Sequence, residues 1–440
     1  MRWNITCANI FRRRRIKTCA PRSFFSLPAM HILIIHQAFA SLNEPGGTRH
    51  HEFARLLVSR KHTVTVIASP VSYLTGNQTS QASEEINGVT ILRASVYGAH
   101  HKSFFHRVLA FFSFMFSSFW IGLGLKNIDL VWGTSPPIFQ GATAWALARI
   151  KHARFLFEVR DLWPQFAIAV GVLKNPVLIA MSKWLERFLY RRADQVVVNS
   201  PGFLDHVSSV GARHVALIPN GAEPAMFDPN GSVEPFRQSN GLKDKFIVLY
   251  AGAHGMSNDL NILLEAASLL ANKSIQIVFV GDGKEKSALV NQAQEMKLPN
   301  VTFLPPVPKT EMPEVLAGAD ACVAILKPLE EYKRTYPNKV FDYMAAGRLV
   351  ILAIDGVIRE VIESAGCGYF CEPGNPAALA EVITKLAEDK IKAREMGLRG
   401  RKYLEENFSR EKVSNQLVNL LEEMCCHRVS MNEVPPKGLS

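Results

Sequence analysis

The sequence lacks the features that identify several large classes of protein. Its seven cysteines include no Cys-x-x-Cys pair and no Cys/His cluster with the spacing of zinc ligands. Cysteines scattered in this way form no disulfide framework and indicate a reducing compartment. No Asp-x-Asp occurs anywhere, so the chain has no obvious pair of carboxylates for a divalent metal. We therefore expect no metal site and no bound cofactor.

Acidic residues are absent from residues 1–29, which contain six Arg and one Lys. Most of the formal net charge of +11 therefore lies in this segment, and the rest of the chain is only mildly basic. Nucleic-acid binding is not expected, because it needs basic charge on the folded body. The segment has no apolar core of a secretory signal. It is interpreted either as an extension without function or as a targeting or membrane-surface tail, and is expected to be disordered.

The 440 residues exceed what one hydrophobic core usually serves, so two domains are expected. From Met30 onward short apolar strands alternate with helical stretches. This is typical of an α/β fold with mostly parallel sheets and helices on both faces. The first half is predicted to contain strands at Ile32–Ile35, Thr63–Ile67, Val89–Arg93, Asp129–Trp132, Arg154–Val159 and Gln195–Asn199.

A stretch rich in Pro, Gly and Asn, Ala222–Asn240, interrupts this alternation and is interpreted as a linker. The second half is then predicted to contain strands at Phe246–Tyr250, Ile275–Val280, Val301–Leu304, Ala321–Ile325 and Leu349–Ala353. The chain is accordingly divided into an N-terminal domain (30–230), a C-terminal domain (240–405), a helix packing back toward the N-terminal domain (406–425) and a disordered tail (427–440).

One apolar run, Val108–Leu125, contains no charged residue and has the minimum length that spans a bilayer. It can be a buried helix of the first domain. It can also be a helix in the membrane interface, with Phe and Trp immersed and basic flanks near anionic head groups. A true span is a third interpretation, but it would split a domain whose alternating pattern continues on both sides.

Polar and glycine residues follow two strands of the first half, where ligands bind in open α/β sheets. Gly46 and Gly47 open a helix and could let backbone amides approach an anion, although a plain tight loop gives the same pattern. The spacing is not Gly-x-Gly-x-x-Gly, which argues against a dinucleotide oxidoreductase. Glu158, Arg160 and Asp161 end a later strand. They are candidate catalytic residues that could position a sugar hydroxyl or act as a base; a structural Arg–Asp pair is the alternative.

Two strand–glycine–helix turns in the second half could hold phosphate or sugar oxygens against backbone amides. Each turn alone would also be a common loop. The candidate donor-binding residues in these turns are Gly252, His254, Gly255, Gly281, Asp282 and Gly283.

The segment Tyr336–Gly347 is the most informative part of the sequence. Asn338 is predicted to cap a helix, which places Lys339 and Asp342 on one face of its first turn. A cation at the positive end of a helix is unfavourable unless an anion is bound. A diphosphate would supply that anion, and the nearby carboxylate could accept the hydroxyls of a ribose.

Three motifs of the second half carry a family resemblance: Asp342-Tyr-Met-Ala-Ala-Gly347, Ile358-Arg-Glu360 and Gly368-Tyr-Phe-Cys-Glu372-Pro-Gly374. Together they resemble the donor lobe of retaining GT-B glycosyltransferases of family 4. The segment Glu158–Pro164 and the segment Trp132–Ile138 are similar to a branch that builds bacterial surface polysaccharides, typified by aminofucosyl transferases of O-antigen synthesis. The resemblance runs from Met30 to about Met424 and implies two Rossmann-like domains facing a cleft.

The resemblance implies that Asp342 takes the place of the second glutamate of a Glu-x7-Glu motif, which binds the nucleotide ribose. The place of the first glutamate falls on Arg334. The arginine and lysine that usually grip the diphosphate fall on Ala253 and Asn258. The phosphate charge would then be met by Lys339, by Lys333 or Arg334, and by the backbone amides around His254 and Gly255.

The sequence thus predicts a retaining glycosyltransferase that takes its sugar from a nucleotide-diphosphate sugar, with UDP as the expected nucleotide. The expected acceptor is a lipid-linked glycan of bacterial surface polysaccharide synthesis, and the expected location is the cytoplasmic face of the inner membrane. Two alternatives are a nucleotide-sugar 2-epimerase of the same fold and a non-enzymatic bilobal sugar-binding protein. The fold alone does not distinguish between these three functions.

Overall fold

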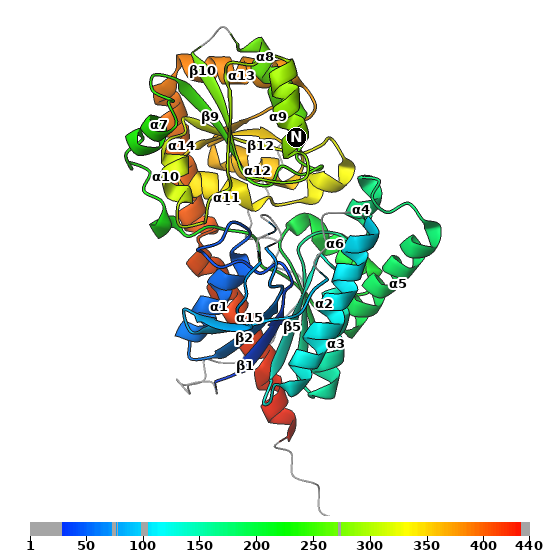
Figure 1. Ribbon diagram of the computed structural model, residues 1–440. Coiled ribbons are helices and arrows are strands. Elements are labelled where there is room, and N and C mark those ends of the chain that lie inside the picture. Colours follow the sequence, from blue (N-terminus) through cyan, green and yellow to red (C-terminus); the bar gives the residue numbers. More distant parts are fainter. Residues whose placement is uncertain (1–28, 73–75, 77, 98–103, 272–273, 433–440) are drawn as a thin grey trace, which may run out of the picture.

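The computed structural model describes residues 29–72, 76, 78–97, 104–271 and 274–432. Two separate sheets, each covered by helices, form two lobes stacked end to end (Figure 1). The predicted α/β class with two Rossmann-like domains is confirmed. The predictions of disorder for residues 1–28 and 433–440 lie outside the described residues.

The N-terminal lobe contains an eight-stranded sheet in the order β3-β4-β2-β1-β5-β6-β7-β8. Every neighbouring pair is parallel except β3 and β4. Its strands are β1 (His31–Ile35), β2 (Thr63–Ala68), β3 (Ser83–Ile86), β4 (Val89–Arg93), β5 (Leu130–Ser135), β6 (Arg154–Val159), β7 (Gln195–Val198) and β8 (Val215–Leu217). Its helices are α1 (Arg49–Ser59), α2 (Phe104–Gly124), α3 (Phe139–Ile150), α4 (Gln165–Ala169), α5 (Pro176–Arg192), the 3-10 helix η2 (Pro201–Phe203) and α6 (Leu204–Val210).

The C-terminal lobe contains a six-stranded parallel sheet in the order β11-β10-β9-β12-β13-β14. Its strands are β9 (Phe246–Ala251), β10 (Ile275–Val280), β11 (Val301–Leu304), β12 (Ala321–Ile325), β13 (Leu349–Ala353) and β14 (Gly368–Phe370). The remaining helices are η3 (Pro224–Met226), α7 (Glu234–Ser239), α8 (Leu260–Leu269), α9 (Lys286–Glu295), α10 (Met312–Ala317), η4 (Glu330–Arg334), α11 (Asn338–Ala345), α12 (Val357–Ala365), α13 (Pro376–Glu388), α14 (Lys390–Asn407) and α15 (Arg410–Asn432).

The strands are apolar on both faces because both faces of each sheet are covered. In β1, Ile32 and Ile34 pack in the hydrophobic cluster that includes α1, while Leu33 and Ile35 pack in the cluster on the opposite face. Strands buried on both faces read as continuous apolar runs rather than as alternating ones. This explains why the strands of both halves could be recognised in the sequence.

Every predicted strand is present within a few residues of its predicted bounds. Strands β3, β8 and β14 were missed. The strands β8 and β14 have only three residues each, and β3 carries two glutamates at an antiparallel edge. The prediction of a bare linker over Ala222–Asn240 is wrong in part. Helix α7 lies within it, and Phe236 of that helix is buried in the core of the C-terminal lobe.

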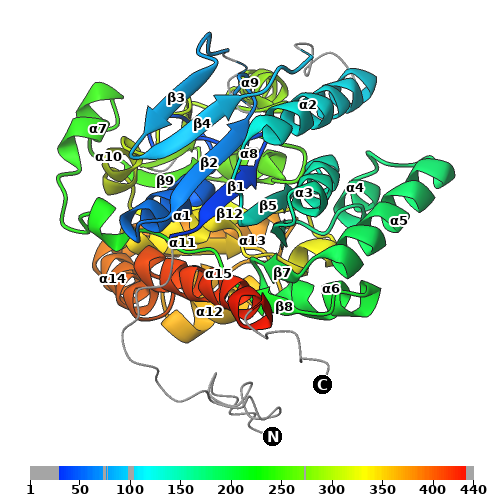
Figure 2. The same ribbon diagram turned by 90° about the horizontal axis from the view of Figure 1, so that it is seen from below.

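Helix α15 leaves the C-terminal lobe and runs along the N-terminal lobe, as Figures 1 and 2 show. Val413, Leu417, Val418 and Leu421 are buried with side chains of the first sheet and α1. The helix continues to Asn432 and so includes residues 427–432, the first part of the tail for which disorder is predicted from the sequence.

The uncharged run Val108–Leu125 lies mostly in α2, which packs against α3 and β2. Phe114 and Ser118 are buried, whereas Phe116 and Trp120 are 60% and 69% exposed. Within the described ranges, no helix combines the length and the apolar character that crossing a membrane requires. Of the three interpretations, the two that keep this helix on the N-terminal lobe fit the structure: one of its faces is buried and the other is an exposed apolar face.

Candidate active site

Segments that follow the carboxyl ends of strands in both sheets meet at the junction between the lobes. The Ser200 hydroxyl, after β7, lies 2.5 Å from the carbonyl of Arg334 in the loop after β12. The Asn220 side-chain amide donates to the carbonyl of Tyr336 over 2.7 Å. The backbone amide of Thr310 donates to Leu42, in the loop after β1, over 3.3 Å. Ligands of open α/β sheets bind at these strand ends, so both sets of predicted site loops converge here.

Lys339 is the second residue of α11 and lies beneath the loop after β9. Its ammonium nitrogen is 2.7 Å from the Tyr250 hydroxyl oxygen, 3.3 Å from Oδ1 of Asn258 and 4.0 Å from the centre of the Tyr250 ring. Burial lowers the pKa of Lys339 to about 7. None of the described carboxylates forms an ion pair with it. A cation at the positive end of a helix, without a counter-charge, is costly unless an anion joins it.

The capping prediction for α11 needs correction. Pro337 occupies the cap position, and Asn338 is the first helical residue, with its side-chain amide 3.4 Å from the Asp342 carboxylate. The missing cap bond leaves amides at this helix end without a partner from the cap side chain. Lys339 nevertheless lies in the first turn, as predicted from the sequence.

Asp342 faces a different partner from the one that its spacing indicates. Its carboxylate forms an ion pair with Lys309 at 2.5 Å, and its side chain is 15% exposed. Burial raises the pKa of Asp342, although Lys309 acts in the opposite direction. Lys309 lies in the loop after β11, next to the residue that contacts the N-terminal lobe. No pattern in the sequence indicates this ion pair, because it joins separate strand–helix units.

The glycines of the two C-terminal loops are needed chiefly for close packing between those loops. A Cβ atom on Gly281 would lie 1.9 Å from the carbonyl oxygen of Gly252, and one on Gly283 would lie 2.5 Å from that of His254. All three glycines, Gly252, Gly281 and Gly283, have positive φ angles between 147° and 155°. The amides of Gly252, His254 and Gly281 donate to the carbonyls of Val280, Asp282 and Leu304. They are therefore not free for an anion in this structure.

Other features of these loops remain open to a ligand. The Gly283 amide donates to the Asp282 carboxylate over 2.7 Å, whereas no described acceptor takes the amide of Gly255. The His254 ring is buried and neither of its nitrogens has a hydrogen-bond partner among the described residues. Burial lowers the pKa of His254 to about 4, so the ring is neutral at physiological pH.

Glu158 is the centre of a buried charged cluster in the N-terminal lobe. Its carboxylate lies 2.9 Å from Nε of Arg49, 2.6 Å from Nε2 of His50 and 3.2 Å from Nε1 of Trp132. Burial alone would raise the pKa of Glu158, but His50 and Arg49 outweigh it and hold the pKa well below its usual range. With no exposed surface, Glu158 can act on a bound molecule only through the side chains that it holds.

Asp161 and Arg160 follow Glu158 and lie nearer to the C-terminal lobe. Arg160 donates to the carbonyl of Pro136 over 3.0 Å. The side chain of Asp161 forms no ion pair with any described residue, and Tyr332 of η4 lies close enough to sense its charge. Burial raises the pKa of Asp161 to about 6, with Arg160 opposing the shift. A carboxyl group with a raised pKa at a lobe junction is a candidate acid or base.

Gly46 and Gly47 lie just before α1, whose N-terminus faces the same junction. Gly46 has a φ of +148° and lies against Ala40, while a Cβ on Gly47 would meet no atom within 4 Å. The cap residue Thr48 forms no side-chain cap bond, so the first amides of α1 are not satisfied by it. The arrangement is compatible with the predicted anion loop.

Comparison with known proteins identifies the reaction class. A model described as Glycosyl transferase 4-like domain matches residues 46–221, and one described as Glycosyl transferases group 1 matches residues 232–403. A curated relative of Escherichia coli K12, WcaI, is named for colanic acid biosynthesis and glycosyl transfer. It is 25% identical over 389 residues, which cover 84% of this chain and 94% of that protein. The chain is a glycosyltransferase. The epimerase and the sugar-binding protein considered from the sequence are not favoured by these matches.

This glycosyltransferase also shares its fold with solved structures. Sucrose-phosphate synthase of Thermosynechococcus elongatus superposes with a TM-score of 0.75 at 18% identity, covering 90% of this chain and all of that one. Anabaena HepE, solved in complex with UDP and glucose, gives a TM-score of 0.69 at 16% identity with the same coverage. The glycosyltransferase thus has the GT-B fold.

Two contributors to the site of this glycosyltransferase were missed in the sequence, Tyr250 and Lys309. Tyr250 is the penultimate residue of β9 and resembles one more apolar strand residue, yet its hydroxyl contacts the Lys339 ammonium. Lys333 and Arg334, suggested as phosphate ligands, are oriented otherwise. The side chain of Lys333 is 42% exposed and pairs with Glu330 at 2.6 Å, while the carbonyl of Arg334 binds the N-terminal lobe.

Proposed function

We propose that this glycosyltransferase moves a sugar, with retention of anomeric configuration, from a UDP-linked donor to a lipid-linked glycan during bacterial surface polysaccharide synthesis. The observation that carries the proposal is the Lys339 ammonium, which is buried at the start of α11 without a carboxylate partner. A diphosphate would supply the missing negative charge. The proposal also includes the retaining mechanism and a location at the cytoplasmic face of the inner membrane.

The donor would occupy the C-terminal side of the junction. In place of the family's lysine stands Asn258, and the Lys339 ammonium lies 3.3 Å from its side-chain oxygen. We infer that Lys339 supplies from α11 the positive charge that relatives supply from the loop after β9. Asp342 would accept the ribose hydroxyls, and the amide of Gly255 would donate to a phosphate oxygen. Because no Asp-x-Asp is present, we assign to these groups the stabilisation of the negative charge on the leaving diphosphate.

The acceptor would occupy the N-terminal side, near Asp161. In the transfer, the bond between the anomeric carbon and the donor phosphate oxygen breaks, and a bond from that carbon to the acceptor oxygen forms on the same face. The proton of the acceptor hydroxyl passes to the Asp161 carboxylate, and the electron pair leaves with the diphosphate. Arg160 and the buried cluster of Glu158, Arg49 and His50 would position this carboxylate and the loop before α1.

Lys339 would act mainly in the transition state, when negative charge builds on the departing diphosphate. Fixed donors aimed at such charge lower the barrier because no reorganisation is needed when it forms. The name of the colanic acid relative supports a polysaccharide product, and the UDP bound in HepE supports uridine as the nucleoside of the donor. The exposed apolar face of α2 supports an acceptor that is held at a membrane.

The proposal is tested by a screen of nucleotide sugars with a lipid-diphosphate acceptor, measuring nucleotide release by the wild type, Lys339→Ala and Asp342→Ala. Lys339→Ala should release about 100-fold less nucleotide than the wild type, the usual loss for a transition-state donor. Asp342→Ala should also release less nucleotide, because the contact with the ribose hydroxyls is lost. Lys402→Ala, an exposed lysine on α14, is the matched control and should match the wild type. Equal release by all four proteins would refute the assignment of the donor site.

A further inference from the structure

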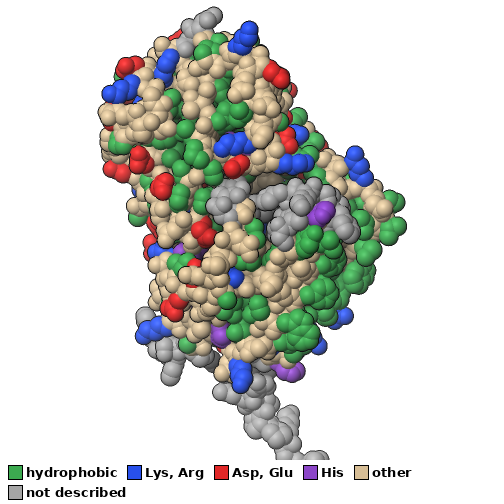
Figure 3. Space-filling view, viewed as in Figure 1, with side chains coloured by type: hydrophobic (Ala, Val, Ile, Leu, Met, Phe, Trp, Pro, Cys, Tyr) green, Lys and Arg blue, Asp and Glu red, His purple; other side chains and the backbone are tan. Residues whose placement is uncertain are grey.

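Large hydrophobic side chains are exposed along one flank of the N-terminal lobe. Helices α2, α3 and α5 lie side by side there in Figures 1 and 2, and Figure 3 shows hydrophobic side chains gathered over this flank. Nine of the fourteen exposed large hydrophobics among the described residues belong to these helices: Leu109, Phe112, Phe116, Trp120, Ile150, Val177, Leu178, Met181 and Trp184. So strong a concentration on a single flank indicates an interaction surface.

The exposed residues form stripes with helical spacing. Phe112, Phe116 and Trp120 follow one another at intervals of four along α2, while Phe114 on the other side is buried. Met181 and Trp184 form a similar stripe on α5 and are 61% and 65% exposed. Helices with one apolar face and aromatic side chains at its border lie in the plane of a membrane interface.

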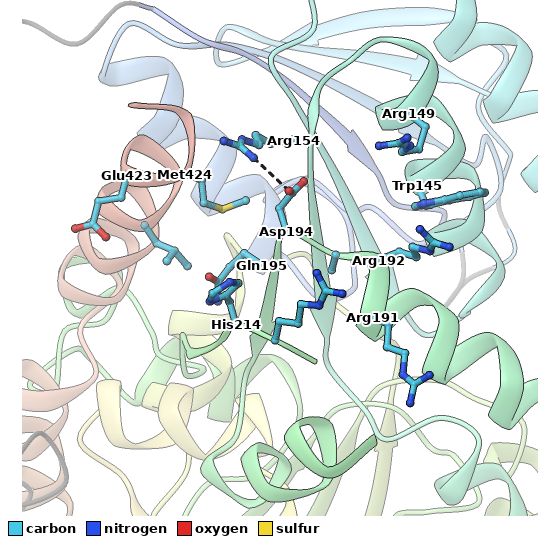
Figure 4. A pocket seen from close by; sticks show the side chains of 13 residues that line it. Trp145, Arg149, Arg154, Arg191, Arg192, Asp194, Gln195, His214, Glu423 and Met424 are labelled. Atoms are coloured by element: carbon cyan, nitrogen blue, oxygen red, sulfur yellow. Dashed lines mark hydrogen bonds and ion pairs between the residues drawn. The ribbon is translucent and has the colours of Figure 1, made fainter. Parts of the chain in front are cut away.

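An arginine-rich cavity of about 750 Å³ lies beside this flank, at the amino ends of β6, β7 and β8 (Figure 4). Its only acidic lining residues are Asp194 and Glu423. The one ion pair within it joins Arg154 to Asp194 at 3.3 Å. The other guanidinium groups of the lining have no hydrogen bond or ion pair with any described residue: Arg149, Arg191, Arg192 and Arg213. Positive charge therefore exceeds negative charge in the cavity.

Further donors in the cavity wall also lack acceptors. Nε1 of Trp145 and Nε of Arg154 are buried and have no hydrogen-bond partner among the described residues. A buried donor without a partner is costly. Arginine is suited to binding an oxyanion, because its planar fork of N–H groups matches the geometry of phosphate.

Aromatic side chains connect the apolar flank to this cavity. The ring of the exposed Trp184 stacks on that of Phe188, with 5.5 Å between the ring centres. The Phe188 ring in turn contacts Trp145 of the cavity wall, with 4.7 Å between the ring centres. The guanidinium of Arg192 lies 5.7 Å from the centre of the Phe188 ring. The exposed apolar residues and the arginines thus belong to one continuous surface, defined here as the α2–α5 surface.

We propose that the α2–α5 surface docks on an anionic bilayer, with its apolar side chains in the interface and the phosphate of an anionic lipid head group in the arginine cavity. An anionic bilayer would engage both the exposed apolar side chains and the arginine cavity, since interfacial binding combines buried apolar area with attraction to anionic lipid. This inference deepens the membrane location in the proposed function and rests on it, but it makes no use of the donor site.

Vesicle flotation with the full chain tests the proposal. Vesicles of phosphatidylcholine alone are compared with vesicles that also contain phosphatidylglycerol, at low and at high salt. The wild type should bind the anionic vesicles at least about tenfold more tightly, and high salt should weaken this binding. Arg149→Glu/Arg213→Glu should lose at least about 30-fold in affinity for the anionic vesicles, given the contribution of each basic residue near such a surface. Trp120→Ser/Trp184→Ser should weaken binding at both salt concentrations.

Matched controls come from the C-terminal lobe. Lys243→Glu/Lys402→Glu reverses two exposed charges there, and Ile391→Ser removes a side chain that is 76% exposed. These variants should bind vesicles as the wild type does. Thermal unfolding of every variant checks that the fold is retained. Binding of a nucleotide sugar in solution, measured on the same samples, should be unchanged in all of them, so a failed docking surface is distinguished from a failed donor site.

Several results would overturn the proposal. They are equal binding of wild type to both vesicle types, vesicle binding that neither pair of substitutions weakens, and binding of inorganic phosphate without any binding to vesicles. A stable dimer in light scattering that Trp120→Ser/Trp184→Ser dissociates would also overturn it, because the apolar flank would then be covered by a second copy of the chain.

Discussion

At the scale of single residues, the site is defined by charges held in unusual surroundings. Lys339 and Asp161 are both partly buried, which disfavours the charged form of each, and none of the described carboxylates pairs with Lys339. Both groups therefore titrate near neutral pH, where small changes of pH alter their charge. Two predictions follow from these opposite shifts.

Donor binding should weaken as the pH rises above 7. The free protein loses the Lys339 proton above its pKa of about 7, while a bound diphosphate would hold that proton. The dissociation constant of a nucleotide sugar should therefore increase by up to about tenfold per pH unit above this value. Lys339→Arg should remove the dependence, because a guanidinium stays charged. Calorimetric titrations over a pH series measure the dissociation constant. If it depends on pH in Lys339→Arg as it does in the wild type, the role of Lys339 is contradicted.

Turnover should fall as the pH drops below 6. The Asp161 carboxylate has a raised pKa of about 6, so it is protonated below that pH and cannot accept the acceptor's proton. Asp161→Asn should lower kcat by about 100-fold, a usual contribution for a general base, and should abolish the acidic limb of the pH profile. Asp205→Asn, an exposed carboxylate on α6, is the control. If Asp161→Asn keeps both the rate and the acidic limb, another group is the base.

At the scale of elements, the loops after β9 and β10 work as one unit. Gly252, Gly281 and Gly283 allow the two backbones to touch, and the His254 amide donates to the carbonyl of Asp282 across them. Their close packing fixes the backbone surface against which the Lys339 ammonium and Tyr250 lie. The pattern strand–glycine–helix was visible in the sequence, but the partner of each loop was not.

Gly281→Ala should therefore destabilise the protein. The new methyl group would lie 1.9 Å from a backbone oxygen, at a φ of +150° that favours glycine. The free energy of unfolding should fall by about 2 kcal/mol or more. Gly47→Ala, where no atom lies within 4 Å, should change stability by less than about 0.5 kcal/mol. Urea denaturation of the two variants measures the difference, and similar losses in both would argue against the packing role.

At the scale of the whole molecule, α15 joins the two lobes. Arg410, at its start, forms an ion pair with Glu52 of α1, and one of its guanidinium nitrogens lies 2.5 Å from the carbonyl of Gly221. Burial opposes the charge of Glu52, but Arg410 and Lys309 outweigh it and lower the pKa of Glu52 to about 2. The apolar face of α15 then completes the core of the N-terminal lobe.

Loss of that apolar face should destabilise the N-terminal lobe. Leu417→Ala removes a side chain that is 1% exposed between α15 and the first sheet, and should cost about 2–5 kcal/mol. Gln416→Ala, on the exposed side of the same helix, should be nearly neutral. Hydrogen exchange resolves which lobe opens: faster exchange in the C-terminal sheet alone would contradict this arrangement.

The sequence by itself determined eleven of the fourteen described strands, because runs of apolar residues buried on both faces dictate strands regardless of their partners. It also located the helix turn that carries Lys339 and Asp342 and the loop that carries Asp161, since chemistry in this fold gathers at strand ends. Tertiary structure alone decided the pairing of charges: Asp342 with Lys309, Lys339 with Tyr250 and Asn258, and Glu158 with Arg49 and His50. These contacts join segments far apart in the chain. Their energies depend on distance and burial, which exist only once the lobes have folded.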